Sequence, residues 1–387
     1  MEPGMKRWRV AIARDTAVPM LGLHGLYVAC NGLPGVEVVG LFDSKADDLA
    51  DVMAVTGAKQ HYREYTQMLD TTCPDLVVCC SRHPHDHFQQ IAAAAERGIH
   101  LYCEKPVTVS LQEADELVAL IERNNIKFCA AHPSRYDAGF LQMKQMIADG
   151  AIGRPLTVIG RGKCDHRGGG EDMMVLGTHI LDLQTFFFGA PQAVWAEVLR
   201  GGQPVRADER TATVEPVGPT AGDEIFAVFR LPDGVRAVFE SRRGLIDRSR
   251  QRTHMGIAVV GSEGTLSHRF DDSGEATLQL SRGTTPPDID AHFEEVPVKD
   301  SRTIPGAAPL EDSLRGVHAP QASMFLKSNR HAVWDLIQSI QENRQPISNL
   351  YNARLTLEMI YGVYASHLTG RVVGFPLTDR THPLERR

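Results

Sequence analysis

The segment HLYCEKP at residues 100–106 places a lysine directly after a short apolar run that predicts a buried strand at 99–103. Ligands of open α/β sheets bind beyond the carboxyl ends of the strands. Pro106 cannot continue the backbone ladder, so the chain must turn there. We therefore expect Glu104 and Lys105 to border a ligand crevice; the alternative is a solvated lysine on a surface loop.

The segment GGGEDMMVLGTHILDLQTFFFG at 168–189 is a second cluster of reactive residue types. Its helical periodicity puts Asp172 and His179 on one face, two turns apart. This arrangement suits a helix that points into a pocket, although a lone histidine is also found as a hydrogen-bonded core residue. We expect His179 and Lys105 to converge between two domains on one substrate hydroxyl and to handle its proton.

The stretch SRHPHDH, Ser81 to His87, follows another predicted strand at 75–80 and borders the same crevice. Its alternating histidines suggest a metal site. Extended alternation alone does not fix a tetrahedral set of ligands. We therefore expect no metal here.

The first 130 residues alternate between predicted strands and helices, which indicates a doubly wound parallel sheet of the Rossmann type. Strands are expected at 9–13, 36–42, 75–80, 99–103 and 126–131. Helices are expected at 44–56, with Ser44 as N-cap, and at 111–124, with a capping box of Ser110 and Glu113.

Asp43 ends the second of these strands, where a Rossmann domain places the carboxylate that accepts hydrogen bonds from the adenosine ribose. This position favours NAD as the cofactor over NADP; the alternative is a helix-capping aspartate. The phosphate loop after the first strand departs from the GxGxxG pattern. Its first two glycine positions hold Ala13 and Asp15, and the glycines that remain are Gly22 and Gly25.

After residue 150 the pattern changes to strands with few helices between them, which indicates a second α+β domain with a large, mostly antiparallel open sheet. Strands are expected at 156–163, 193–199, 224–231, 235–241, 256–260 and 276–280, with a hairpin turn at LPDGV, and helices at 332–343 and 352–368. Residues 281–330 predict a long irregular excursion. The expected domains are 1–130 and 131–387. Too few helices remain to cover both faces of the second sheet, so we expect a homodimer or homotetramer.

The composition is that of a globular protein, with 42% hydrophobic and 23% charged residues and a formal net charge of −7 over 387 residues. Dispersed basic residues argue against nucleic acid as a partner. The one basic run, 241–252, is either a strand end with a solvated loop or an anion-binding patch. A signal peptide and a membrane span are not expected, and the seven cysteines suit small core positions. We expect a cytoplasmic location and no membrane partner.

Together these segments resemble the glucose-fructose oxidoreductase, inositol dehydrogenase and MocA family over nearly the whole chain. The matching pieces are PGVEVVGLFD (34–43), AAAAERGIHLYCEKP (92–106), HPSRY with DGAIGRP (132–155), GGG with GTHILD (168–182) and VVGSEGTL (259–266). The resemblance implies an N-terminal domain that binds NAD(P). It also implies a C-terminal domain whose open sheet forms the substrate floor and the subunit contact.

The resemblance also implies roles for individual residues. Lys105 corresponds to the catalytic lysine of EKP, and His179 to the site histidine. The family usually has Asp four residues before this histidine, where this chain has Val175, so we assign that catalytic role to Asp172. The implied cofactor-binding set is Ala13, Asp15, Gly22, Gly25, Asp43, Ser81, Arg82, His83, His87, Glu104 and Lys105, and the implied substrate-binding set is Lys105, Arg135, Asp172 and His179.

The implied activity is hydride transfer between NAD and a sugar, cyclitol or related polyol. Two alternatives stay open. One is a glycoside hydrolase or lyase that oxidises its substrate transiently and then eliminates a leaving group. The other is a non-catalytic relative that has lost its cofactor, which the missing loop glycines and Val175 permit.

Overall fold

The computed structural model describes residues 6–15, 24–45, 47–245, 255–270, 277–283, 291–309 and 323–385. The chain forms two compact units. Unit 1 comprises Met1–Thr108, Glu113–Tyr136 and Ser301–Ala353, and unit 2 comprises Val109–Gln112, Asp137–Asp300 and Arg354–Arg387. The sequence pattern predicts one boundary after residue 130, whereas Ser301–Ala353 belongs to unit 1.

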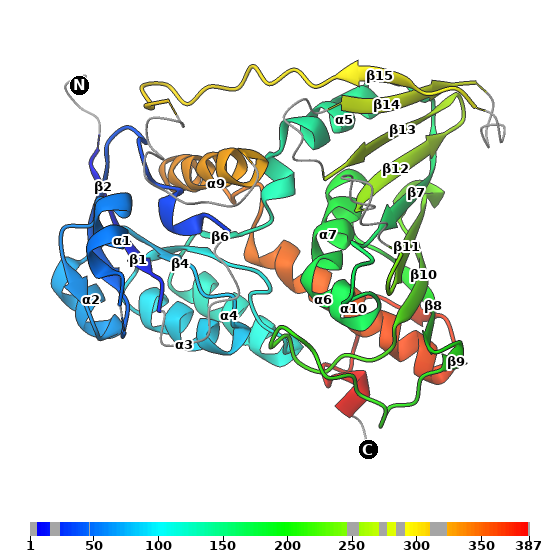
Figure 1. Ribbon diagram of the computed structural model, residues 1–387, viewed down its shortest axis with the longest axis horizontal. Coiled ribbons are helices and arrows are strands. Elements are labelled where there is room, and N and C mark those ends of the chain that lie inside the picture. Colours follow the sequence, from blue (N-terminus) through cyan, green and yellow to red (C-terminus); the bar gives the residue numbers. More distant parts are fainter. Residues whose placement is uncertain are drawn as a thin grey trace. The chain divides into compact units, whose positions relative to one another are not determined.

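Unit 1 is built on a six-stranded parallel sheet in the order β3-β2-β1-β4-β5-β6, the doubly wound order of a Rossmann domain (Figure 1). The predicted parallel sheet is confirmed, and each predicted strand lies within two residues of its observed limits. The strands are β1 (Trp8–Ala13), β2 (Val36–Phe42), β3 (His61–Tyr62), β4 (Leu76–Cys79), β5 (His100–Cys103) and β6 (Phe128–Ala130).

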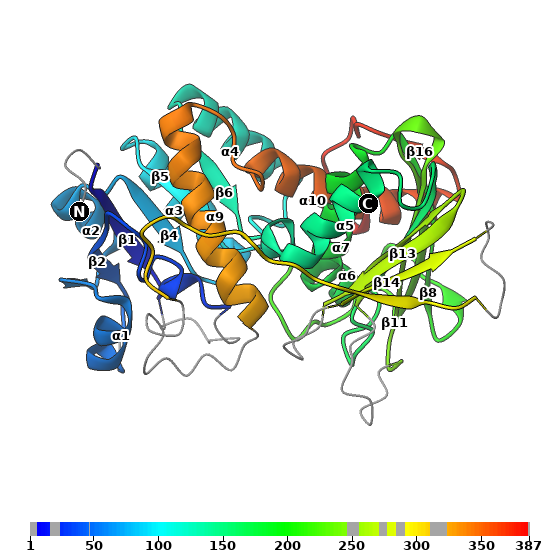
Figure 2. The same cartoon turned by 90° about the horizontal axis from the view of Figure 1, so that it is seen from above.

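Alternation along β1 builds a core on each face of this sheet. Val10 and Ile12 join one buried cluster and Ala11 and Ala13 the other, because successive strand side chains point to opposite faces. Helix α9 (Ser323–Glu342) covers the first face, and α3 (Pro84–Ala95) and α4 (Leu111–Arg123) cover the second (Figures 1 and 2). Helix α9 belongs to unit 1 because Ala332, Val333, Leu336 and Ile337, at helical spacing, pack into this core.

The predicted helix 44–56 is wrong at its start, because α1 spans only Leu49–Thr56. Ser44 does not cap it. The Ser44 hydroxyl donates instead to Oδ1 of Asp15 at 2.5 Å. Helix α2 (Tyr65–Thr72) and the short helices η1 (Leu26–Val28) and η2 (Pro133–Tyr136) complete the first part of unit 1.

Unit 2 contains a ten-stranded sheet in the order β15-β14-β13-β12-β7-β11-β10-β8-β16, with β9 paired to β8. The pairing is antiparallel except between β7 and β11, so the predicted mostly antiparallel sheet is confirmed. The strands are β7 (Pro155–Arg161), β8 (Ala193–Arg200), β9 (Gln203–Pro204), β10 (Glu224–Arg230), β11 (Arg236–Arg242), β12 (Gly256–Gly261), β13 (Gly264–Arg269), β14 (Thr277–Arg282), β15 (Glu294–Pro297) and β16 (Val373–Gly374).

Helices α5 (Ala138–Ala148), α6 (Gly170–Val175) and α7 (Gly177–Phe188) lie along one face of this sheet (Figure 2). Helix α7 approaches β7 closely because position 160 is glycine; a Cβ at Gly160 would lie 2.2 Å from Cγ2 of Ile180. The other face exposes three large apolar side chains, one on β7 and two on the adjacent strands β8 and β10. Ile159, Trp195 and Phe226 are 37%, 44% and 41% exposed, and the rings of Trp195 and Phe226 are in edge contact.

Three predictions for unit 2 and the C-terminal region need correction. Strand β13 was absent from the prediction because its residues GTLSHR alternate only weakly in polarity. Part of the predicted irregular excursion 281–330 is regular, since β15 pairs with β14 and α9 begins at Ser323. The final helix is α10 (Leu350–Thr369), slightly longer than predicted. Most of the basic run 241–252, from residue 246 on, lies outside the described residues.

Among the described residues, no helix is both long and apolar enough to cross a membrane. The cysteines are free thiols, buried except for Cys73, as predicted for small core residues.

Candidate active site

Lys105 lies two residues after the end of β5, at the edge of the parallel sheet where the carboxyl ends of its strands meet. Only 3% of its surface is exposed. Its backbone N–H donates to Oε2 of Glu104 at 2.8 Å. The alternative of a solvated loop lysine is therefore wrong for this structure.

Glu104 is a buried carboxylate surrounded by basic side chains. Its Oε1 lies 2.7 Å from Nδ1 of His24. Burial alone would raise the pKa of Glu104, but His24, followed by Lys105 and Arg82, outweighs burial and lowers the pKa to about 2. Glu104 is thus ionised at neutral pH. His24 was missed in the sequence; the only signal was its place in the glycine-poor loop, next to Gly25.

Asp43 ends β2 and is fully buried. Its Oδ2 lies 3.7 Å from Nε of Arg14, and its Oδ1 accepts a hydrogen bond from the backbone N–H of Lys45. Arg14 also donates to both carboxylate oxygens of Asp48, at 2.8 and 2.9 Å. The N-cap position of α1 is Asp48, so the alternative of Asp43 as a helix-capping residue is wrong.

The loop after β1 differs from a glycine loop in its chemistry. Asp15 has φ of 38°, in the left-handed region that glycine adopts at little cost, and its side chain is bound to Ser44. Gly25 also has a positive φ, and a Cβ there would lie 2.4 Å from Cδ2 of Leu326 in α9. Ala13 is the buried last residue of β1, and Gly22 lies outside the described residues.

The Ser81–His87 segment enters α3 and is tied to the turn after Lys105. The ring of His87 is fully buried, with Nε2 2.9 Å from the Ser81 carbonyl oxygen and Nδ1 3.0 Å from that of Val107. The backbone N–H of His83 donates to the Ser81 hydroxyl, which donates to Asp86. No group of His, Cys, Asp and Glu that could hold a metal occurs among the residues described.

Arg135, assigned to substrate by resemblance, lies in η2 of unit 1 and is 5% exposed. Its guanidinium Nη1 donates to the carbonyl oxygen of Ile347 at 3.1 Å. Its assigned role stays a prediction.

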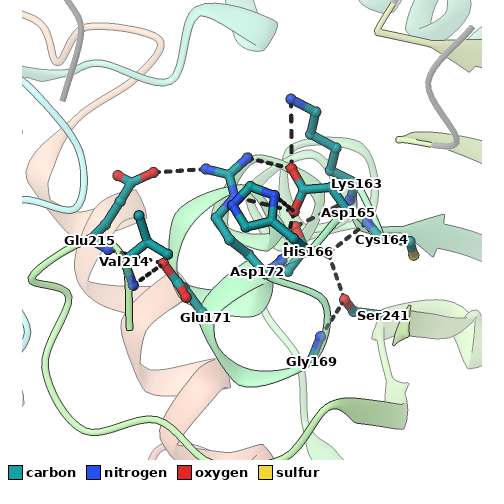
Figure 3. Close-up of polar contacts among 11 residues, drawn as sticks. Lys163, Cys164, Asp165, His166, Gly169, Glu171, Asp172, Val214, Glu215 and Ser241 are labelled. Carbon is teal, nitrogen blue, oxygen red and sulfur yellow. Dashed lines mark hydrogen bonds and ion pairs between the residues drawn. The ribbon is translucent and has the colours of Figure 1, made fainter. Parts of the chain in front are cut away.

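In unit 2, Asp172 is fully buried and its carboxylate accepts three hydrogen bonds (Figure 3). The donors are the backbone N–H groups of Lys163 and Cys164, at 3.2 and 3.1 Å, and the hydroxyl of Ser241, at 2.5 Å. Burial raises the pKa of Asp172, against the lowering effect of these hydrogen bonds. Asp172 therefore fixes the turn after β7 against β11.

The predicted single helix from Asp172 to Gly189 is broken into α6 and α7 at Leu176, which has φ of −108°. The break separates Asp172 from His179, so the two residues do not share the face of one helix. His179 lies in the first turns of α7 and is 3% exposed, with its ring centroid 6.0 Å from that of Phe270.

The three glycines at the start of α6, Gly168 to Gly170, are required by backbone packing. A Cβ at Gly168 would lie 2.2 Å from Cα of Arg243, and one at Gly170 would lie 2.4 Å from the Ala221 carbonyl oxygen. At Gly169, which has φ of 91°, a Cβ would lie 2.5 Å from the Gly222 carbonyl oxygen. The backbone N–H of Gly169 donates to the Ser241 hydroxyl.

A charge cluster next to Asp172 was also missed in the sequence. Arg167 is paired with Asp165 at 2.7 Å and with Glu215 at 2.8 Å, all three largely buried. Glu171 accepts hydrogen bonds from the backbone N–H groups of Val214 and Glu215 (Figure 3). The signal available in the sequence was the charged run KCDHR directly before the three glycines.

Two curated relatives and two solved structures show what this chain is similar to. It is 23% identical over 240 residues to a myo-inositol 2-dehydrogenase of Thermotoga maritima, covering 62% of this chain and 69% of the relative. It is 29% identical over 196 residues to a D-apiose dehydrogenase of Paraburkholderia graminis, covering 48% and 52%.

Among solved structures, an NAD binding oxidoreductase from Klebsiella pneumoniae has a TM-score of 0.72 at 22% identity, covering 96% of this chain and 100% of that one. A levoglucosan dehydrogenase in complex with NADH and levoglucosan has a TM-score of 0.71 at 18% identity, with the same coverage. At 22% and 18% sequence identity, the similarity to these two structures establishes the fold of this chain and nothing more.

The family models match most of the chain. The model described as "Oxidoreductase family, NAD-binding Rossmann fold" matches residues 22–132, and the "GFO/IDH/MocA C-terminal domain" matches residues 140–267. The resemblance found in the sequence is confirmed, and the chain belongs to the GFO/IDH/MocA family of oxidoreductases.

Proposed function

We propose that this oxidoreductase is an NAD-dependent dehydrogenase that acts on a CH–OH group of a sugar, cyclitol or related polyol. The observation that carries the proposal is Lys105, buried at the end of β5 beside the ionised Glu104. Relatives named as inositol and apiose dehydrogenases support this substrate class. Buried titratable groups at such strand ends are typical of catalytic sites.

The carboxyl edge of the sheet in unit 1 has polar and charged groups that fit a dinucleotide. Asp43 supplies a buried carboxylate at the end of β2 for ribose hydroxyls. Arg82 and Lys105 supply positive charge after β4 and β5, close enough to lower the pKa of Glu104. Bound NAD would supply the hydride acceptor for oxidation of the alcohol.

Side chains of the protein transfer the proton of the substrate hydroxyl. We assign a role in proton transfer from the substrate hydroxyl to Lys105 and, on the basis of the resemblance, to His179. Glu104 keeps a negative charge next to Lys105 and accepts a hydrogen bond from its backbone N–H.

The surroundings of Asp43 favour NAD over NADP. Arg14 is paired with Asp48, and Lys45 is paired with Asp47 at 2.9 Å. Among the residues described, Asp15 and Asp43 bring the carboxylates near the end of β2 to four, whereas the cations paired with them there are two, Arg14 and Lys45. A ribose 2′-phosphate would meet net negative charge there.

We therefore expect NAD to bind at least tenfold more tightly than NADP, a difference of about 1.4 kcal/mol. The Asp43→Asn variant should reduce the ratio of the NADP to the NAD dissociation constant, because it removes the charge that repels the 2′-phosphate. The dissociation constants of NAD and NADP are measured by titration calorimetry for the wild type and for Asp43→Asn. Equal or tighter NADP binding by the wild type would overturn the assignment.

The catalytic role is tested by Lys105→Ala. We expect kcat for polyol oxidation, followed as NADH absorbance, to fall about 100-fold or more, since a positioned acid–base group typically contributes that much. NAD affinity should stay within about tenfold, because the residue acts mainly in the transition state. His179→Ala should behave in the same way.

Matched controls for these variants are Lys59→Ala, an exposed lysine of unit 1, and His292→Ala, an exposed histidine of unit 2. Both should keep wild-type turnover. A Lys105→Ala enzyme with full activity on a substrate that the wild type oxidises would refute the mechanism.

The carboxylate assignment is tested by Asp172→Asn. The carboxamide has nearly the same shape, and burial raises the pKa of Asp172, so a neutral side chain avoids part of the cost of burying charge. Its NH2 group cannot accept a hydrogen bond, however, so at least one of the donors Lys163, Cys164 and Ser241 loses its acceptor. We expect turnover of the folded enzyme to fall about tenfold and the free energy of unfolding, from urea denaturation at pH 7, to fall by roughly 1–3 kcal/mol. Full activity of Asp172→Asn together with loss of activity in Glu171→Gln would show that the wrong carboxylate was chosen.

We also propose a homodimer or homotetramer formed through the face of the unit 2 sheet that carries Ile159, Trp195 and Phe226. A second copy would bury these exposed apolar side chains, of which Trp195 and Phe226 are in ring contact. Light scattering at micromolar concentration should give at least twice the monomer mass for the wild type and a lower mass for the Trp195→Glu/Phe226→Glu double variant. A monomeric wild type would contradict the proposal.

A further inference from the structure

His24 is held in place from three directions within unit 1. Its Nδ1 lies 2.7 Å from Oε1 of Glu104. Its ring stacks on that of Phe325, with centroids 6.1 Å apart and an interplanar angle of 15°. Its carbonyl oxygen accepts a hydrogen bond from Nδ2 of Asn329 at 2.8 Å. Asn329 is itself fully buried and accepts from the hydroxyl of Tyr102.

These contacts determine the chemistry of the imidazole. Glu104 is ionised and can only accept hydrogen bonds, so Nδ1 of His24 must carry a hydrogen. In the part of the chain that the structure describes, Nε2 makes no hydrogen bond, and the side chain is 22% exposed. In the protonated ring Nε2 also carries a hydrogen, and it can then donate a hydrogen bond to an anion.

The place of His24 in the fold indicates which anion. His24 lies between β1 and η1, and a Rossmann domain binds the dinucleotide pyrophosphate at the connection that follows its first strand. Two other polar side chains described in this connection are already engaged: Arg14 is bonded to Asp48, and Asp15 is bonded to Ser44. Asp15 also brings negative charge to a place where phosphate must bind.

We propose that Nε2 of His24 donates a hydrogen bond to the pyrophosphate of the bound dinucleotide, with Glu104 and Asn329 as its positioning residues. This inference rests on the proposed NAD binding. It explains how a loop with Ala13 and Asp15 at glycine positions retains a phosphate contact: a side chain held by β5 and α9 replaces part of the backbone cradle.

The test compares two amide substitutions. In His24→Asn the amide nitrogen reaches the place of Nδ1, so the bond to Glu104 is kept and Nε2 is lost. In His24→Gln the longer amide reaches the place of Nε2. Affinities for NAD and for ADP-ribose, which has the pyrophosphate but no nicotinamide, are measured by titration calorimetry, with His292→Gln as an exposed control.

We expect His24→Asn to weaken both ligands about tenfold, the size of one hydrogen bond to a charged group. His24→Gln keeps a donor at the place of Nε2 but loses the bond to Glu104, so it should bind both ligands more tightly than His24→Asn and less tightly than the wild type. His292→Gln should stay within about threefold of the wild type. Wild-type affinity in His24→Asn, or a loss confined to NAD, would overturn the inference while the proposed function stands. No NAD binding by the wild type itself would overturn both.

Discussion

The buried negative charge of Glu104 is the constraint on which the candidate site of unit 1 depends. An ionised carboxylate without water is costly unless cations and hydrogen-bond donors surround it. Here His24 and the backbone N–H of Lys105 bond to it, and Arg82 adds charge. The charge therefore links three strand ends: the connection after β1, the start of α3 after β4, and the turn after β5. A single side chain thus determines where the basic groups of this edge lie.

Unit 2 also contains a buried carboxylate that holds neighbouring segments together by hydrogen bonds. Asp172 joins the turn after β7 to Ser241 of β11, and Ser241 in turn accepts the backbone N–H of Gly169. The three glycines let the entry to α6 pass against the backbones of residues 221–222 and 243. Hydrogen bonds and close backbone contacts thus set the geometry of the entry to α6.

Much of the fold could be predicted because its signals are local. The apolar runs at 36–42 and 99–103 are bounded by turn residues, and periods of 2 and 3.6 distinguish strands from helices. Lys105 and Asp43 could be placed at strand ends for the same reason. The bond between His24 and Glu104 could not, since 80 residues separate them. The break between α6 and α7 at Leu176 could not be predicted either, because the apolar residues of 172–188 keep a helical spacing across it. Ser44 failed as a cap because Asp15 binds its hydroxyl.

Helix α9 has a consequence for the order in which the chain folds on the ribosome. The sheet face that carries Val10 and Ile12 is closed by Val333 and Leu336, yet residues 131–322 must be synthesised between β6 and α9. At about 5–20 residues per second this takes on the order of 10 to 40 s. Through that interval the nascent sheet exposes an apolar face, so the emerging chain is a natural client for chaperones, and a version of the protein that ends after β6 would be prone to aggregate.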